Sequence, residues 1–360
     1  MYASAAKKIK VAVLYGGCSG EHEVSRQSAT AVINHLDKNK FEIIPIEIDQ
    51  QGGWHLLSVS SMQNTSIKTA QIVSPWSFVA EQQANFCDVW FPVLHGSLGE
   101  DGAIQGLLEM LGVPYVGANV LGSAIGMDKE IAKRLAREAT IPILPFLAFN
   151  TGQWLSHRSD YEAAIQATIA YPLFVKPANT GSSLGISKVK QPSELAAAVE
   201  RAFQYDTKIL VEPALMVREI EVAVLESLHF GLPPEISCAG EIVVNHEFYS
   251  YEAKYLDEKA AELMIPAKLS TAHEEQIKHF SVELFRHLAT QGMARIDFFI
   301  DSHTQAIYFN EINTIPGFTK ISMYPKLWEA SGRSYADLLT HLITLALQRA
   351  ARTKQLKRSL

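Results

Sequence analysis

The feature that most constrains the fold is a short apolar segment that ends in paired glycines near the start of the chain. Residues 10–15 (KVAVLY) are almost entirely apolar, and Gly16 and Gly17 follow directly. Such a segment is typical of a buried strand that enters a tight loop. Residues 23–36 then show helical spacing. The sequence therefore predicts a strand, a loop and a helix in succession, as in α/β folds.

Further segments extend this pattern through the first third of the chain. We predict strands at residues 41–48 and 89–94 and a helix at residues 104–111. Alternating strands and helices favour an α/β layer with parallel strands. Another helix, rich in Ala, Lys, Arg and Glu, begins near Asp128 and ends at Ile141. We expect a new domain to start with it.

The later strands have different patterns. Residues 173–177 and 209–213 each resemble a strand that ends in a charged residue followed by proline. Residues 220–224 alternate like a half-exposed strand, and residues 294–300 and 306–311 resemble a strand pair around a short turn. A chain of 360 residues is long enough for two or three domains. We predict three domains, at residues 1–127, 128–217 and 218–360.

Charge and hydropathy exclude several partners. The net charge is −6 and the basic residues are scattered, so no continuous cationic surface is available for a nucleic-acid backbone. We interpret the basic residues 349–358 as a solvated helix end. Residues 11–15 are too few for the core of a signal peptide, and no segment is long enough to span a membrane. We therefore expect neither a nucleic-acid nor a membrane partner.

The cysteines indicate a reducing cytoplasm. Cys18, Cys87 and Cys238 are odd in number and far apart, so they form neither a disulfide framework nor a paired metal site. Cys18 lies in a glycine-rich loop, where a nucleophile is conceivable. Nothing near it in the sequence indicates an activated thiol, so we interpret it as an ordinary loop cysteine.

The strongest group of polar residues lies on two consecutive strands. Arg295 and Asp297 are two positions apart on the first strand, and Glu311 and Asn313 end the second. Side chains two apart on a strand point to the same face, so these four polar groups can converge. Oxygen ligands of this kind suit a hard cation such as magnesium. The alternative is a solvated strand face with ordinary ion pairs.

A second motif is KPANTGSSLG at residues 176–185, where a strand ends in lysine and a loop of small residues follows. Backbone N–H groups of such a loop can surround phosphate oxygens, while Lys176 supplies a point charge. The order differs from that of a Walker loop, in which the lysine follows the glycines. Taken alone, the loop could equally be a flexible surface hairpin.

Two glycine-rich loops at strand ends carry polar side chains. The loop at residues 16–23 (GGCSGEHE) does not match a dinucleotide fingerprint, although an acidic side chain there could hold a ligand ammonium. Alternatively, the loop caps the helix that follows. The second loop contains His95 and has too many glycines to belong to a core. No metal-ligand partner lies at a suitable spacing from this histidine.

Seven segments, taken in order, resemble the D-alanine:D-alanine ligases of the ATP-grasp superfamily. They are GGCSGEHEVS, LHGSLGEDG, GMDK, KPANTGSSLG, YEAKY, ARIDFF and NEINTIPGFTKIS. The resemblance implies a three-domain α/β fold, with a parallel N-terminal domain and with ATP between a central and a C-terminal sheet. It also implies a cytoplasmic ATP-dependent ligase that makes D-alanyl-D-alanine for peptidoglycan precursors.

The same resemblance implies the ATP contacts. Lys129 and Lys176 would meet the phosphates, and Glu212 and Glu219 would contact the adenine and the ribose. Pro213 stands where many members of the family have lysine. Because proline has neither charge nor N–H, one adenine-side contact is in doubt.

Residues 251–255 (YEAKY) resemble the mobile lid of the family. In that resemblance Lys254 closes on the γ-phosphate, and Tyr255 links to Ser182 and Glu21. A closed lid excludes water, which matters because the implied intermediate is an acyl phosphate on the first D-alanine.

The implied mechanism follows from charge. Two magnesium ions, for which manganese can substitute, would lie on Asp297, Glu311 and Asn313 and neutralise the phosphates. The amine of the second D-alanine then attacks the acyl phosphate. Arg295 and the Gly317 amide would stabilise the resulting oxyanion.

The resemblance also implies the substrate contacts. Glu21 would hold the ammonium of the first D-alanine, with His95 near its carboxylate, and Ser322 would bind the second carboxylate. The sequence shows no dedicated base for the attacking amine. Family members are commonly dimers, so we expect a homodimer.

Two other functions remain open from the sequence. A related ligase could make a D-alanine:D-lactate ester, although Tyr255 argues against it because lactate-selective relatives carry histidine in that role. The chain could also be a nucleotide-binding regulatory module that kept the fold without turnover. The complete set of magnesium and phosphate residues argues against such a module.

Overall fold

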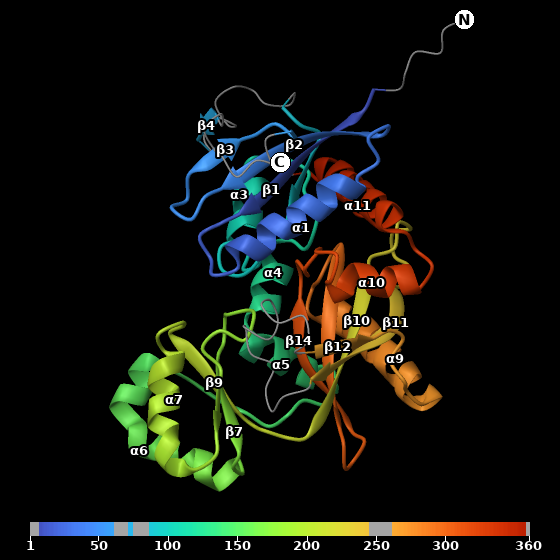
Figure 1. Ribbon diagram of the computed structural model, residues 1–360. Coiled ribbons are helices and arrows are strands. Elements are labelled where there is room, and N and C mark those ends of the chain that lie inside the picture. The colour runs from blue at the N-terminus through green and yellow to red at the C-terminus, as the bar shows by residue number, and fades with distance from the viewer. Residues whose placement is uncertain (1–6, 61–70, 75–85, 245–260, 358–360) are drawn as a thin grey trace, which may run out of the picture.

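The computed structural model describes residues 7–60, 71–74, 86–244 and 261–357, and the strands in this part of the chain form three sheets (Figure 1). Sheet A, at the top of Figure 1, has the strand order β4-β3-β2-β1-β5. Strands β1 (Ile9–Gly16), β2 (Phe41–Ile48) and β5 (Val89–Pro92) are parallel, as predicted. Strands β3 (Trp54–Leu56) and β4 (Gln71–Val73) pair antiparallel at one edge, so the prediction of a parallel layer was wrong there.

The turn between β2 and β3 explains the antiparallel edge. The Asp49 carboxylate accepts hydrogen bonds from the backbone N–H groups of Gln51 and Gly53, at 2.9 and 2.8 Å. Gly52 has a φ of 86°, which glycine adopts readily. So short a turn can join only antiparallel strands, because parallel strands need a long crossover connection.

Predicted helices of the first third of the chain lie where expected. They are α1 (His22–His35), α3 (Ala103–Met110) and α5 (Lys129–Glu138). Helix α4 (Val120–Met127) directly precedes α5, and Asp128 lies between the two. The Asp128 side chain caps α5 by accepting a hydrogen bond from the Ile131 N–H at 3.1 Å. This cap defines where α5 begins and so places Lys129 on its first turn.

Sheet C is antiparallel and has one covered face. Its strand order is β6 (Leu147–Asn150), β9 (Lys208–Pro213), β7 (Leu173–Pro177) and β8 (Ser187–Val189). The helices α6 (Thr151–Thr168) and α7 (Leu195–Ala202), with the short helix η3 (Pro192–Glu194) before α7, lie on one side of β7 and β9 (Figure 1). Phe149, Trp154 and Val199 belong to the core on this side. The opposite face is left for the site described below.

Sheet B is antiparallel, and helices cover one of its faces and part of the other. Its strand order is β12 (Ala261–Met264), β11 (Glu235–Val244), β10 (Val217–Leu225), β13 (Met293–Asp301) and β14 (Ile307–Asn313). Helix α9 (Thr271–His287) and helix α10 (Met323–Ala330) both pack against β10. Residues 220–224 of β10 are therefore buried throughout, and the prediction of a half-exposed strand was wrong.

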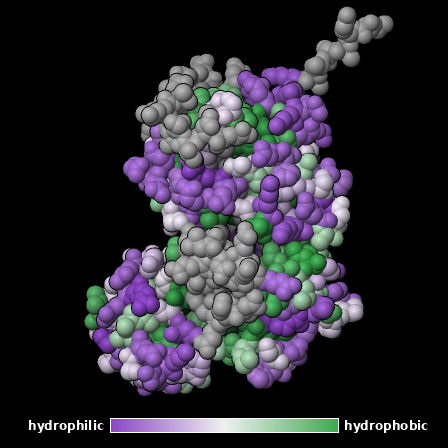
Figure 2. Space-filling view, viewed as in Figure 1, coloured by the Kyte–Doolittle hydropathy of each residue, from purple (hydrophilic) through white to green (hydrophobic). Residues whose placement is uncertain are grey.

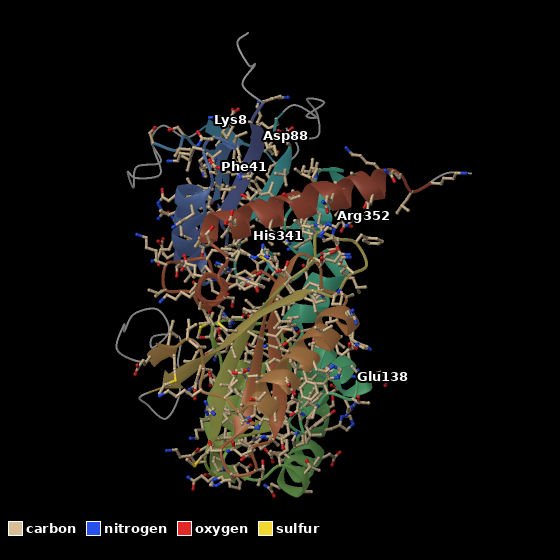
Figure 3. All side chains as sticks on the ribbon, turned by 90° about the vertical axis from the view of Figure 1, so that its right-hand side faces the viewer. Lys8, Phe41, Asp88, Glu138, His341 and Arg352 are labelled. Atoms are coloured by element: carbon tan, nitrogen blue, oxygen red, sulfur yellow. The ribbon has the colours of Figure 1, made fainter. Side chains whose placement is uncertain are left out.

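The C-terminal helix returns to sheet A. Helix α11 (Tyr335–Lys354) crosses the molecule below the strands of sheet A, with His341 and Arg352 along it (Figure 3). Its buried side chains share one core with β1, α1, β5 and α10. The strands of sheets A, C and B thus follow one another along the chain, but the last helix packs on the first sheet. The domain limits at residues 127 and 217 stay predictions.

Arg349 corrects the interpretation of residues 349–358 as a solvated helix end. Its guanidinium donates to the carbonyl oxygens of Gly117 and Tyr115 at 2.7 and 2.6 Å, and to Gln291 Oε1 at 3.0 Å. The guanidinium also lies 4.6 Å from the centre of the Tyr115 ring. Helical spacing did not reveal this role, because it depends on the packing of α11 against a loop more than 200 residues earlier.

The surface is mostly hydrophilic on the face shown in Figure 2, with an apolar area over sheet B. Within the described ranges, no helix combines the length and the apolar character that a membrane span requires. The three cysteines are free thiols, and Cys18 is exposed.

Candidate active site

A cleft of about 700 Å³ lies between sheets B and C. Its walls come from both sheets, from the start of α5 and from the loop at residues 178–186, which we call the serine loop. The polar lining residues include Lys129, Lys176, Ser182, Glu219, Glu221, Asp297 and Glu311. Phe174, Pro213 and Leu215 provide apolar lining beside them. The cleft is therefore lined by apolar side chains as well as by lysines and carboxylates.

The strand register brings the four predicted polar residues together. Arg295 lies opposite Asn313, and Asp297 lies opposite Glu311, across β13 and β14. Arg295 Nε and Nη2 donate to the two carboxylate oxygens of Asp297 at 2.8 and 2.7 Å. Asn313 Nδ2 donates to Asp297 Oδ2 at 3.1 Å. Asp297 is buried, so this strand face is not solvated, although the ion pairs of the alternative interpretation are present.

The donor set of this group fits a hard divalent cation. Asp297 and Glu311 offer carboxylate oxygens, and Asn313 offers an amide oxygen. Among the described residues, no group of three or more His, Cys, Asp and Glu side chains could hold a metal. A cation between Asp297 and Glu311 would therefore need a further oxygen, which the Asn313 amide could offer. Magnesium is commonly bound by one or two carboxylates together with waters and phosphates, whereas zinc prefers His and Cys.

Glu221 on β10 also belongs to this group, although it was not predicted from the sequence. It lies opposite Asp297 on the other side of β13, and its Oε2 is 2.9 Å from Arg295 Nε. Burial lowers the pKa of Arg295, but Asp297 and Glu221 outweigh this effect and raise it well above its usual value. Glu219 and Glu221 are two apart on one strand, and this spacing was the available signal.

Lys129 connects the serine loop with the acidic group. Its Nζ donates to the Thr180 carbonyl oxygen at 2.7 Å and lies 3.2 Å from Glu311 Oε2. The Lys129 N–H also donates to the Ala178 carbonyl oxygen at 3.0 Å. The first turn of α5 thus holds one cation where the two sheets approach each other.

Lys176, Glu212 and Lys133 form a buried ion triad, which we call the lysine–glutamate triad. Glu212 Oε2 is 2.7 Å from Lys176 Nζ, and Glu212 Oε1 is 2.8 Å from Lys133 Nζ. Burial raises the pKa of the Glu212 carboxyl, but the two ammonium groups outweigh this effect and lower it to about 2. Lys133 lies one helical turn after Lys129 and was not predicted from the sequence.

The two glutamates that were predicted to contact the nucleotide have different environments. Glu219 lines the cleft, whereas Glu212 is fully buried and is held by lysines through both oxygens. Pro213 lines the cleft next to it. The roles of these residues toward adenine and ribose stay predictions.

The serine loop contacts the loop after β1. Ser182 Oγ donates a hydrogen bond to Glu21 Oε1. Glu21 occupies the N-cap position of α1 but makes no capping hydrogen bond through its side chain, so the alternative of a helix cap was wrong for this residue. Ser182 and Ser183 have φ values of 53° and 59°, an unusual conformation for residues other than glycine. The serine loop therefore makes a specific contact with the loop after β1 and is not a free surface hairpin.

Two glycines make room for Glu21. A Cβ atom at Gly96 would lie 2.5 Å from Glu21 Oε2, and one at Gly181 would lie 2.9 Å from it. These distances are shorter than any normal contact, so larger residues would displace the carboxylate. The three loops that contain Glu21, Gly96 and Gly181 thus meet at this side chain.

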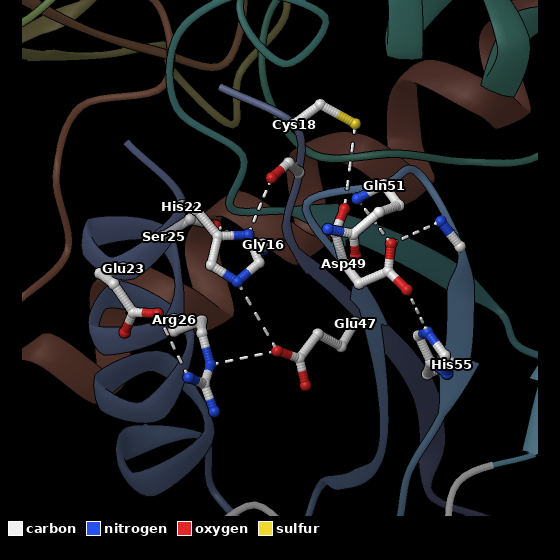
Figure 4. A network of polar contacts seen from close by, with 12 residues as sticks. Gly16, Cys18, His22, Glu23, Ser25, Arg26, Glu47, Asp49, Gln51 and His55 are labelled. Atoms are coloured by element: carbon white, nitrogen blue, oxygen red, sulfur yellow. Dashed lines mark hydrogen bonds and ion pairs between the residues drawn. The ribbon is translucent and has the colours of Figure 1, made fainter. Parts of the chain in front are cut away.

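A polar network anchors the loop after β1 from behind (Figure 4). His22 Nδ1 lies 2.8 Å from the Gly17 carbonyl oxygen, and Arg26 Nε lies 3.1 Å from the buried carboxylate of Glu47. The Gly16 N–H donates to Ser25 Oγ at 2.8 Å. The contacts fix both the start of the loop and the first turn of α1, which flank Glu21.

His95 is buried, which corrects the interpretation that its loop lies outside the core. Only 4% of its surface is exposed. Its Nε2 lies 3.0 Å from Ser28 Oγ, and its Nδ1 lies 3.1 Å from the Ile315 carbonyl oxygen. Burial lowers the pKa of His95, but Glu100 and Glu21 outweigh this effect and raise it. Residues after β14 cover the loop, and the sequence alone did not indicate this contact.

Gly317 and Ser322 lie close together in the segment after β14. Ser322 Oγ accepts a hydrogen bond from the Thr319 N–H at 3.0 Å. A Cβ atom at Gly317 would lie 2.7 Å from Ser322 Oγ. The Phe318 N–H donates to Ser28 Oγ at 3.2 Å, so this segment is tied to α1. Lys254 and Tyr255, the predicted lid residues, lie outside the described residues.

Two antiparallel sheets around a cleft with paired lysines and an acidic strand end define an ATP-grasp fold. Residues 10–118 match the family model described as "D-ala D-ala ligase N-terminus", and residues 135–344 match "D-ala D-ala ligase C-terminus". The chain belongs to the D-alanine–D-alanine ligase family. The resemblance inferred from the sequence motifs is confirmed.

Several relatives are similar over nearly their whole length. A D-alanine–D-alanine ligase from Caldicellulosiruptor bescii is 47% identical and covers 98% of this chain and 99% of the relative. D-alanine–D-alanine ligase A from Bradyrhizobium diazoefficiens is 45% identical at the same coverage.

Solved structures of similar fold are also ligases of this kind. The D-alanine–D-alanine ligase from Coxiella burnetii has a TM-score of 0.81 and 36% identity, and the match covers 97% of each chain. A D-Ala:D-Ser ligase from Enterococcus faecalis has a TM-score of 0.80 and 34% identity, covering 94% of this chain and 100% of the other.

Proposed function

We propose that this protein joins two D-alanine molecules with the energy of ATP, releasing ADP and phosphate, and so supplies D-alanyl-D-alanine for peptidoglycan precursors. The observation that carries the proposal is the hydrogen bond between Ser182 and Glu21. It joins the loop beside the cleft to a buried carboxylate that can hold a substrate ammonium. An amino acid bound there would present its carboxylate near the phosphates of a nucleotide in the cleft.

The cleft between sheets B and C is the proposed ATP site. Lys129 and Lys176 supply positive charge for the phosphates, and Lys254 closes on the γ-phosphate. Glu219 lines the cleft, which supports its proposed contact with the ribose. Glu212 is buried behind the lining. It would therefore contact the adenine only after a small movement of its side chain, or would affect adenine binding through neighbouring residues.

Asp297, Glu311 and Asn313 are the proposed ligands of two magnesium ions, for which manganese can substitute. Bound divalent ions would neutralise the phosphates and so favour transfer of the γ-phosphoryl group to the carboxylate of the first D-alanine. Lys129 also lies beside Glu311, so the protein itself contributes positive charge at the same place.

The residues around the cleft have separate roles in the peptide-bond step. Glu21 holds the ammonium of the first D-alanine, and His95 lies behind it. Ser322 binds the carboxylate of the second D-alanine. Arg295 and the Gly317 N–H stabilise the oxyanion that forms when the second amine attacks. Tyr255 completes the contact of Ser182 and Glu21 when the lid closes.

One assay tests the proposed function. Purified protein is incubated with ATP and magnesium and with D-alanine, L-alanine, or D-alanine together with D-lactate or D-serine, and the product mass is determined. We expect a dipeptide of two D-alanines and phosphate release that requires D-alanine. D-serine is included because one similar structure is a D-Ala:D-Ser ligase.

The other outcomes of this assay identify the alternatives. An ester with D-lactate as the sole product at neutral pH would indicate a depsipeptide ligase. Preferential formation of the D-alanine–D-serine product would point to the activity named for the Enterococcus faecalis structure. ATP binding without any D-alanine-dependent phosphate release would favour a regulatory module.

We further propose that the protein works as a homodimer in the cytoplasm. Three free thiols suit a reducing compartment. Met110 on α3 and Leu121 on α4 are 80% and 57% exposed, and exposed apolar side chains on neighbouring helices suit contact with a second copy. Sedimentation of the wild type and of Leu121→Glu tests the dimer, with Leu155→Glu on α6 as a control. A monomeric wild type would refute this assignment.

A further inference from the structure

Lys133 is an unusual residue in this molecule because it is a lysine with only 1% of its surface exposed. It lies on α5, one turn after Lys129, and does not line the cleft between sheets B and C. Burying an ammonium group is costly unless it is paired. Its Nζ is 2.8 Å from Glu212 Oε1 and 3.5 Å from the Phe309 carbonyl oxygen. Lys133 thus connects β9 of sheet C with β14 of sheet B.

The lysine–glutamate triad has two cations and one anion. Glu212 is shared between Lys133 and Lys176, at one oxygen each. Of the two lysines, only Lys176 lines the cleft. Lys133 balances the charge of Glu212, so the triad keeps a net positive charge. This charge lies at the Lys176 ammonium, which lines the cleft.

Without Lys133, the charges would be distributed differently. The Glu212 carboxylate would have Lys176 as its sole cationic partner in the triad, and both of its oxygens would be free to bind that ammonium. The pair would then be neutral. Lys176 would be drawn toward Glu212 and would attract a phosphate in the cleft less strongly.

We propose that Lys133 is a positioning residue for the nucleotide: it holds Glu212 from behind, so that Lys176 stays directed toward the cleft and keeps its charge available for phosphate. This inference rests on the proposed ATP site. It assigns a role to a residue that touches neither nucleotide nor substrate.

The test uses Lys133→Met in the full-length protein, with Arg134→Met as the matched control. Arg134 is the next residue on α5, and its side chain is 55% exposed. Titration with ATP and magnesium should give a dissociation constant about tenfold higher for Lys133→Met and unchanged for the control. The KM for ATP should rise in parallel, whereas the KM for D-alanine should stay the same. A purely structural role would not produce this split.

The double variant K133M/E212Q tests whether Lys133 acts through Glu212. Glutamine removes the negative charge, so Lys176 is no longer neutralised and phosphate binding should recover. The recovery is measured by the competition of inorganic tripolyphosphate with ATP. Tripolyphosphate has no adenine, so the predicted contact between Glu212 and adenine does not affect its binding. If Lys133→Met alone does not fold, wild-type affinity of a folded double variant for tripolyphosphate still supports the role.

Two results would overturn the inference. One is a folded Lys133→Met protein that binds ATP as tightly as the wild type. The other is a folded double variant whose affinity for tripolyphosphate stays about tenfold below that of the wild type. Failure of the wild type itself to bind ATP is a different result, because it would refute the proposed nucleotide site and not the role of Lys133 within it.

Discussion

Lys129 Nζ and Glu311 Oε2 lie 3.2 Å apart, although the two residues are 182 positions apart in the chain. The pair joins the start of α5 to the end of β14, where the predicted metal ligands lie. A cation that binds there would compete with Lys129 for Glu311. The lysine would then be free to turn toward a phosphate in the cleft.

Glu311→Gln should reduce magnesium-dependent turnover by about a hundredfold, because loss of a carboxylate weakens the neutralisation of the phosphates. The amide keeps the size of the side chain, so the melting temperature should change little. Turnover is measured over a range of magnesium concentrations, and Glu329→Gln on the exposed end of α10 is the control. Unchanged activity would remove Glu311 from the metal site.

Gly96→Ala should raise the KM for D-alanine, because the new methyl group would lie 2.5 Å from Glu21 Oε2. Gly96 also has a φ of 75°, so part of any loss of stability comes from the backbone. Gly112→Ala is a matched control, since Gly112 has a φ of 65° and no heavy atom within 4 Å of a new Cβ. We expect both variants to lose about 1–2 kcal/mol of stability from backbone strain. Equal KM values in the two variants would argue against a role of Glu21 in binding D-alanine.

Arg349→Met should lower the free energy of unfolding by about 2–4 kcal/mol, because it removes hydrogen bonds to the carbonyl oxygens of Gly117 and Tyr115 inside the protein. Urea denaturation measures this change. Arg352→Met, on the same helix but stacked on the exposed Phe230, should have a much smaller effect. Similar losses of stability in the two variants would mean that the hydrogen bonds of Arg349 contribute no special stability.

His341 should make the stability sensitive to acid. Burial lowers its pKa below the ordinary value of 6.5, and Arg333 lowers it further. The unfolded chain therefore binds a proton more readily than the folded one. The stabilising contribution is complete above pH 6.5 and is lost as the pH falls through the folded pKa. Denaturation at several pH values should show a smaller acid dependence in His341→Gln, whereas the exposed His279→Gln should behave like the wild type.

Local periodicity was enough to predict much of the fold and part of the site. The strands at residues 41–48 and 173–177 match β2 and β7, because their apolar runs and closing residues are local signals. The convergence of Arg295 and Asp297 with Glu311 and Asn313 also followed from a local rule, the two-residue repeat of a strand. Motif resemblance then identified the family.

The errors arose where packing between distant segments decides the outcome. Residues 220–224 were predicted to form a half-exposed strand, but all five are buried, and α9 and α10 pack against β10. His95 lies in a loop, as predicted, but the glycines of that loop suggested a position outside the core, whereas the segment after β14 covers the side chain. No periodicity within a strand or helix indicates which other element will lie against it.

By itself, the sequence determined the order of strands and helices, the polar residues that share a strand face, and the family, because these depend on neighbours along the chain. Only the tertiary structure decided that Lys129 faces Glu311 and that Lys133 lies buried against Glu212. The physical reason is that the charge available at a site depends on which groups burial brings within a few ångströms, and those groups come from separate elements of the fold.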